Sequence, residues 1–128
     1  MPEHRDFPAI VCEDPAPYSN VVLDDDYAFL AGLVAADLPE GRAVMGDTAA
    51  ETEAVMTAVG RLLGEVGLGY ADIVRVDVHL ADLGDMPAMN AAYARFFEGG
   101  PLPARTTVEA AALVEGSRVE ITVMARRR

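Results

Sequence analysis

The spacing of hydrophobic and polar residues predicts an amphipathic helix near the middle of the chain. Its apolar members recur at intervals of three and four, at Val55, Val59, Leu62, Leu63 and Val66. Thr48 and Glu51 stand three residues apart just before this stripe and fit a capping box, in which each side chain would accept from the other residue's backbone N–H. Gly67 supplies the end of the helix.

A second helix is predicted after residue 85, because Asp85 suits an N-cap and Pro87 suits the first turn. Its apolar face consists of Met89, Tyr93, Phe96 and Phe97. The sequence Gly-Gly-Pro at 99–101 ends it.

Alternating residues predict a strand over 73–80, with Val74, Val76, Val78 and Leu80 on one face and Arg75, Asp77 and His79 on the other. Residues 21–23 and 27–32 indicate two strands around an aspartate-rich turn at 24–26. The proline-rich and acidic stretch before residue 18 is expected to be a loose arm with one short extended piece at 9–12.

The last third predicts a hairpin, with strands at 105–113 and 118–126 around Glu115 and Gly116. The resulting order favours a single α+β domain over residues 1–128, with a six-stranded, mostly antiparallel mixed sheet and two helices packed on one face. The other face would need a cover. Small and aliphatic residues assigned to it suggest that copies of the same chain supply one: Ala110, Ala112, Val119, Ile121 and Val123.

Composition and charge narrow the function classes. The chain has 128 residues, 52% of them hydrophobic, and a formal net charge of −11. This charge repels phosphate backbones and anionic membranes, so a nucleic-acid partner is disfavoured. No apolar run approaches a membrane span and no export signal is evident, so we expect no membrane association and a cytoplasmic location.

Most familiar catalytic signatures are missing. Cys12 is the only cysteine, which excludes an intramolecular disulfide and a cysteine-based zinc site. We expect Cys12 to be a small buried or half-buried side chain, His79 a structural or solvated histidine, and Asp24–Asp26 a solvated turn. We predict neither a metal site nor a cofactor.

One segment carries candidate chemistry. Pro101 and Pro103 hold the chain extended and place Arg105 at the first position of a strand. The planar guanidinium of Arg105 could there bind a carboxylate through two parallel hydrogen bonds, like the two prongs of a fork. Glu120 lies between two apolar residues of the last strand. Each residue alone also fits an ordinary surface position.

Together these segments resemble the RidA/YjgF family of enamine and imine deaminases. The similar stretches are NAAYARFF at 90–97, LPARTTVE at 102–109, VEI at 119–121, PAPYS at 15–19 and FLAGL at 29–33. The resemblance implies a chorismate-mutase-like fold, a homotrimer with sites between subunits, and cofactor-free attack of water on a 2-imino acid to give a 2-keto acid and ammonia.

The resemblance also assigns roles to residues. Arg105 stands at the position of the substrate-carboxylate clamp and Glu120 at that of the residue that positions or activates water. Tyr18, Gly32, Asn90 and Thr107 occupy substrate-binding positions.

Departures from the family pattern bear on specificity. Many members have serine and glutamine where this chain has Ala31 and Leu33, and several have cysteine at the position of Thr107. The preferred substrate is therefore expected to be larger or more apolar than 2-iminopropionate. Two alternatives remain: a non-catalytic trimer that binds small keto acids or other carboxylates as a sensor, and a ribonuclease, which the acidic charge opposes.

The predicted hairpin also predicts a shared site. It would place Glu120 opposite Ala111 and about 20 Å from Arg105 on the same face of the sheet. One small substrate could not touch both side chains, so Arg105 of one subunit would have to meet Glu120 of a neighbour.

Overall fold

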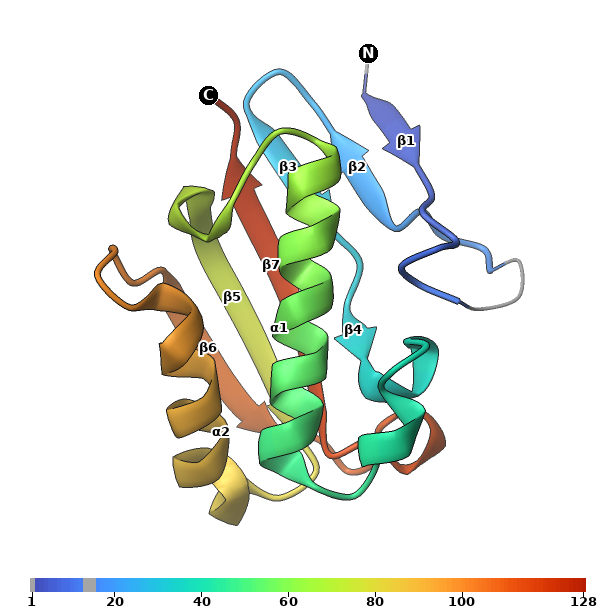
Figure 1. The fold of residues 1–128 in the computed structure, drawn as a ribbon, viewed down its shortest axis with the longest axis vertical. Helices are drawn as coiled ribbons and strands as arrows, with labels where there is room; N and C mark the ends of the chain where they lie inside the picture. Colours follow the sequence, from blue (N-terminus) through green and yellow to red (C-terminus); the bar gives the residue numbers. More distant parts are fainter. Residues whose placement is uncertain (1, 13–15) are drawn as a thin grey trace.

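The protein is a mixed β-sheet with two helices on one face (Figure 1). A computed structural model describes residues 2–12 and 16–128. The helices are α1 (Thr48–Glu65) and α2 (Met86–Ala94). The strands are β1 (Glu3–Arg5), β2 (Val21–Leu23), β3 (Tyr27–Leu30), β4 (Leu33–Val34), β5 (Ile73–Leu80), β6 (Ala104–Glu109) and β7 (Val119–Arg126).

The strand order is β1-β2-β3-β7-β5-β6, and the short β4 pairs with β7. The pairing of β5 with β6 is parallel and the other pairings are antiparallel. This confirms the predicted α+β class, the mixed and mostly antiparallel sheet, and the two helices on one face. The sheet has seven strands rather than six, because the arm contributes β1 and the segment after Gly32 contributes β4.

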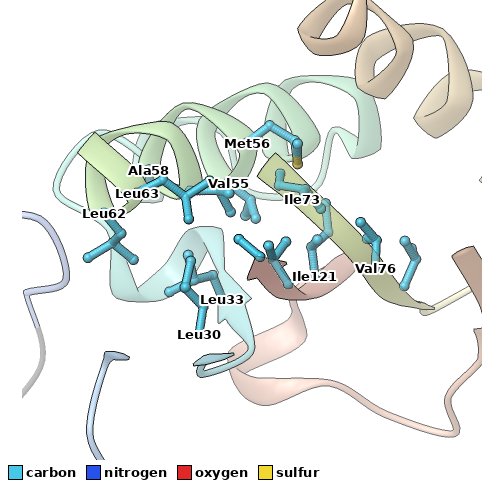
Figure 2. Packing of buried hydrophobic residues seen from close by; sticks show 14 of the residues in the cluster. Leu30, Leu33, Val55, Met56, Ala58, Leu62, Leu63, Ile73, Val76 and Ile121 are labelled. Carbon is cyan, nitrogen blue, oxygen red and sulfur yellow. The ribbon is translucent and has the colours of Figure 1, made fainter. Parts of the chain in front are cut away.

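The core lies between α1 and the sheet (Figure 2). Val55, Val59 and Leu62 of α1 are completely buried, which confirms the predicted apolar stripe, while Val66 at its end is only partly buried. The sheet contributes alternate residues of its central strands, among them Val76 and Ile121. The helix ends at Glu65, and Gly67, with φ +77°, stops it as predicted.

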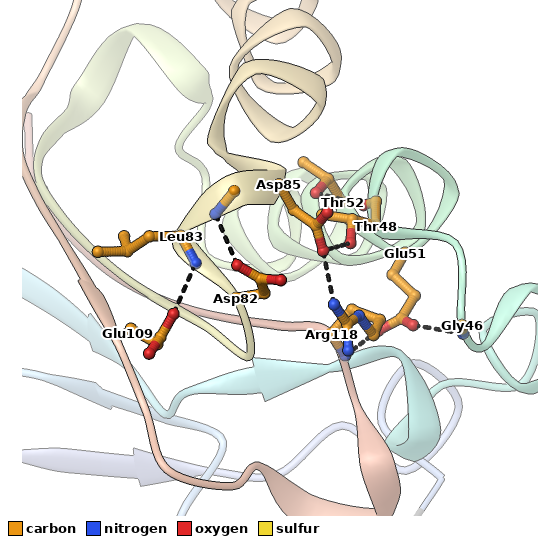
Figure 3. Close-up of polar contacts among 10 residues, drawn as sticks. Gly46, Thr48, Glu51, Thr52, Asp82, Leu83, Asp85, Glu109 and Arg118 are labelled. Carbon is orange, nitrogen blue, oxygen red and sulfur yellow. Dashed lines mark hydrogen bonds and ion pairs between the residues drawn. The ribbon is translucent and has the colours of Figure 1, made fainter.

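The beginning of α1 differs from the predicted capping box. Asp47 is the N-cap, and its carboxylate accepts from the backbone N–H of Ala50 at 3.1 Å. The fully buried Glu51 carboxylate accepts instead from the N–H of Gly46 at 2.7 Å and from the N–H of Arg118 at 2.8 Å (Figure 3). Glu51 therefore fastens the start of α1 to the residue just before β7.

Asp85 precedes α2 as predicted, but its side chain does not cap that helix. Its carboxylate accepts from the Thr48 hydroxyl at 2.9 Å and from the Arg118 guanidinium at 2.7 Å (Figure 3). These two hydrogen bonds, with Arg118 contributing most, lower the pKa of Asp85. The start of α2 is thus tied to α1 and to the approach to β7.

The predicted C-terminal hairpin is wrong. Helix α2 crosses over the sheet between β5 and β6, so β6 runs parallel to β5 at the edge and ends at Glu109. The chain then passes the end of β5 and returns as β7 on the other side of it. Val119, Ile121 and Val123 consequently face the helices and are buried, so they do not form the uncovered face assigned to them.

Strand β5 has the predicted bounds, but Val74 is exposed rather than buried with Val76. An irregularity in the β5–β7 register between Ile73 and Arg75 shifts the alternation by one residue, which a periodic pattern cannot predict.

The N-terminal arm is more ordered than predicted. Residues 3–5 form β1 at the sheet edge, whereas Ile10 and Val11 form a buried turn, with both N–H groups donating to the Phe7 carbonyl, in place of the expected extended piece. Pro15 lies outside the described residues. No helix within the described part of the chain is long and apolar enough to span a membrane.

Candidate functional site

Arg105 lies on the helix side of the edge strand β6. It pairs with Val76 of β5, whose side chain is buried against the helices, and its own side chain lies beside α2. One guanidinium nitrogen donates to Asn90 Oδ1 at 2.7 Å and another is 4.0 Å from Met89 Sδ. The guanidinium carbon lies 5.0 Å from the centre of the Tyr93 ring, within cation–π range.

The surroundings of Arg105 suit an anion. Among the residues that the structure describes, no carboxylate forms an ion pair with it. Thr107 follows two positions later on the same face, and both its Oγ1 and the Tyr93 hydroxyl are buried without a hydrogen-bond partner in the described chain. Burial raises the pKa of Tyr93, against a smaller opposing effect of Arg105, so this hydroxyl remains a donor at neutral pH.

Glu120 lies on the opposite face of the sheet, which neither helix covers (Figure 1). Its side chain is 30% exposed and packs over Gly32. A Cβ at Gly32 would come within 3.1 Å of Glu120 Cδ and 2.9 Å of Thr122 Oγ1. Because Gly32 has no side chain, the Glu120 carboxylate can lie directly over it.

Tyr18 lies near the other end of the sheet. It precedes β2, which is separated from β6 by β3, β7 and β5, a span of roughly 19 Å at normal strand spacing. Its side chain is 47% exposed. Phe29, 40% exposed, and Val108, 43% exposed, lie on the face of the sheet that carries Glu120.

The predicted site residues thus fall into three places within one chain: Arg105, Asn90 and Thr107 beside α2, Gly32 and Glu120 on the open face, and Tyr18 beyond. The prediction that Arg105 and Glu120 share a face is wrong. The registers Val76–Arg105, Val76–Val123 and His79–Glu120 place their Cα atoms about 14 Å apart with side chains on opposite sides.

His79 is a residue whose surroundings the sequence did not reveal. It pairs directly with Glu120 across β5 and β7, and its Nδ1 is 3.8 Å from Glu120 Oε1. The alternation in β5 indicated a polar face, but the pairing of β5 with β7 was missed because the hairpin was expected instead.

The cysteine and the acidic run considered in the sequence do not form a catalytic or metal-binding site in the described chain. Cys12 is exposed rather than buried, and its thiol donates to the Pro8 carbonyl at 3.2 Å. Asp24 accepts from the N–H groups of Asp26 and Tyr27, which makes the acidic run a turn and lowers the pKa of Asp24. In residues 2–12 and 16–128, no group of three or more histidine, cysteine or acidic side chains is arranged to hold a metal ion.

A cavity of about 290 Å³ lies elsewhere, on the outer side of α1, and none of the six predicted site residues lines it. Its lining is mostly apolar and includes Ile10, Leu38 and Ala54, with a Glu40–Arg61 ion pair of 3.2 Å. A carboxylate-binding arginine is better placed beside α2 than here, because Arg61 is already paired.

The chain matches the model of a known family and is similar to several known proteins. The family model described as endoribonuclease L-PSP matches residues 12–127. Protein DfrA of Myxococcus xanthus is 40% identical over 111 residues, covering 85% of this chain and 84% of that protein. The human protein named 2-iminobutanoate/2-iminopropanoate deaminase is 34% identical over 109 residues, covering 85% and 79%. The solved YjgF gene product of E. coli superposes with a TM-score of 0.88 at 28% identity, covering 98% of this chain and 99% of that one.

Proposed function

Because this chain belongs to the RidA/YjgF family, whose model is described as endoribonuclease L-PSP, we propose that it is a cofactor-free hydrolytic deaminase of 2-imino acids. Mammalian relatives that carry the name 2-iminobutanoate/2-iminopropanoate deaminase support the reaction class. The net charge of −11 argues against RNA as the substrate.

The observation that carries the proposal is the environment of Arg105. Its guanidinium is half-buried, stacked over Tyr93 and oriented by Asn90, with no acidic partner in the described chain. In this role the fork binds the substrate carboxylate in a bidentate manner and fixes the adjacent C2 atom. The unpartnered hydroxyls of Thr107 and Tyr93 supply further donors to the bound acid.

Glu120 is the proposed proton acceptor. As the oxygen of water forms a bond to C2 of the protonated imine, the Glu120 carboxylate takes a proton from that water. The proton then passes to the nitrogen of the tetrahedral adduct, the C–N bond breaks with its electron pair, and ammonia leaves. The Glu120 carboxylate then accepts the proton of the adduct hydroxyl as the C2 carbonyl forms, and the released ammonia carries that proton away as ammonium. The imine is itself the electrophile, so the proposed step needs no metal and forms no covalent bond between the substrate and the protein.

The proposed site is completed by a second copy of the chain. Arg105 lies on the edge strand β6, whereas Glu120 lies on the uncovered face. A neighbour whose β6 edge packs against that face would bring its Arg105 toward Glu120 and bury Phe29 and Val108. We propose a cyclic homotrimer, in which such head-to-tail contacts close into a ring.

The residues around the proposed site bear on the size and polarity of the substrate side chain. Thr107 supplies a hydroxyl, while Ala31 and Leu33 beside Gly32 present no polar group, so we propose substrates with larger or more apolar side chains than 2-iminopropionate. Leu33 is buried in β4, whereas Ala31 is partly exposed, so of these two residues Ala31 is the one that can contact the substrate.

A coupled assay tests the function. An amino-acid oxidase generates 2-imino acids of graded side-chain size, and keto-acid release is followed with and without the protein. We expect faster release, with the greatest gain on larger apolar side chains. No gain on any substrate would contradict the proposal, and binding of keto acids without turnover would indicate a sensor.

A further inference from the structure

His79 lies beside Glu120 on the open face of the sheet, which neither helix covers. The two residues are directly paired across β5 and β7, and their facing atoms, Nδ1 and Oε1, are 3.8 Å apart. Gly32 lies on the other side of the Glu120 carboxylate. Glu120 is therefore flanked by a glycine that gives it room and an imidazole that limits where it can turn.

The Nδ1 atom of His79 is buried and has no hydrogen-bond partner among the described residues. Buried polar atoms are normally satisfied, so an unsatisfied nitrogen facing a carboxylate requires an explanation. If Nδ1 carried a lone pair, it would face a negatively charged oxygen. If Nδ1 carries the proton, a movement of about 1 Å makes a normal hydrogen bond.

The neighbours of His79 leave Glu120 as its partner. On β5, Asp77 shares the face but its carboxylate is 3.0 Å from the Arg75 guanidinium, which also donates to Thr106 at 2.7 Å. On β6, the residue opposite His79 is Val108, which offers no polar group.

We propose that His79 positions Glu120, donating its Nδ1–H to the carboxylate so that one oxygen is held and the other faces the substrate. This inference rests on the proposed function. A hydrogen bond that is long in the empty protein and shortens with substrate is common at sites of proton transfer. Fixing the carboxylate removes orientations in which it cannot accept a proton from water, so the effect falls on kcat.

The tautomer of His79 tests the contact without any activity. The chain has two histidines, so His4→Asn assigns the imidazole signals in ¹H–¹⁵N spectra. At about pH 8, where an ordinary imidazole is neutral, we expect His79 to carry its proton on Nδ1. In Glu120→Ala we expect the proton to shift toward Nε2. A wild-type His79 protonated on Nε2 would overturn the proposal.

Two variants test the consequence for turnover. His79→Leu removes the donor, and we expect kcat to fall about ten-fold with KM nearly unchanged. His79→Asn places an amide N–H near the position of Nδ1, and we expect it to recover most of kcat. Wild-type kcat in His79→Leu, or no difference between the two variants, would contradict the positioning role. If the wild type turns over no 2-imino acid, the proposed function fails, and the tautomer then decides the contact alone.

Discussion

Arg105 and Glu120 project from opposite faces of one sheet. The Arg105 guanidinium stacks over Tyr93 of α2, whereas the Glu120 side chain lies over Gly32 on the face that neither helix covers. The strand β5 separates the two strands that carry them. A single chain cannot bring both side chains to one small substrate, so the proposed chemistry requires two copies.

Replacing Arg105 should remove most of the deaminase activity while the fold is retained. Arg105→Ala loses a charge-assisted bidentate contact, and we expect kcat/KM to fall about 30- to 1,000-fold. Arg105→Lys should recover little, because lysine keeps the charge without the fork. The matched control is Arg61→Lys on the outer side of α1, which should behave as the wild type. An Arg105→Ala protein with unchanged kcat/KM on every substrate would refute the clamp.

Asn90 should tune the affinity of the arginine for its anion. Asn90→Asp introduces a carboxylate 2.7 Å from the guanidinium, where it competes with the substrate carboxylate. We expect KM to rise about ten-fold or more with a smaller change in kcat, and Asn90→Ala to raise KM less. Steady-state kinetics of the two variants check this order. A lower KM for Asn90→Asp would contradict binding of an anion at Arg105.

Gly32→Ala should displace Glu120 without unfolding the protein. The new Cβ would lie 3.1 Å from Glu120 Cδ and 2.9 Å from Thr122 Oγ1, and both contacts involve side chains that can move. We expect kcat to fall about 10- to 100-fold. Gly64→Ala in α1 is the control, because open space surrounds that position. It should leave turnover unchanged and add about 0.5–1 kcal/mol to the free energy of unfolding. Equal kcat in both variants would show that Glu120 needs no such space.

Glu51→Gln should destabilise the fold without changing the chemistry. Both Glu51 oxygens accept backbone N–H groups, so an amide would place a donor against the N–H of Gly46 or Arg118. We expect a loss of about 1–3 kcal/mol in the free energy of unfolding, measured by urea denaturation. Glu53→Gln on the exposed side of the same helix should change it by less than about 0.5 kcal/mol. A Glu51→Gln protein as stable as the wild type would mean that this buried carboxylate is not needed to fasten β7.

Much of the fold could be predicted from local pattern. The stripe from Val55 to Leu63 and the alternation of β5 gave elements of the right type, because burial on one face imposes a period on the sequence. Glu51 was identified as a residue important to the start of α1, but its partner Arg118 is 67 residues away and no local pattern indicates that contact.

The site was predicted only in part because residue identity does not determine strand pairing. The segments at 104–109 and 119–126 are both extended and close in sequence, so a hairpin was the simplest interpretation. The parallel crossover through α2 separates them by β5, and this reverses the face on which Arg105 lies relative to Glu120. The same pairing brings His79 to Glu120, which the wrong register concealed. The site is still expected to be shared between subunits, but because Arg105 and Glu120 lie on opposite faces of the sheet rather than far apart on one face.

Each proposed site takes Arg105 from one copy of the chain and Glu120 from its neighbour. Arg105→Ala and Glu120→Gln proteins, each expected to be strongly impaired alone, are unfolded together at equal concentration, refolded and assayed beside each variant refolded separately. In a randomly assembled ring of three, one interface in four receives both native residues, so we expect about a quarter of wild-type kcat per site. Activity no greater than the sum of the two variants, while size-exclusion chromatography and differently tagged copies show mixed assemblies, would contradict a site shared between subunits.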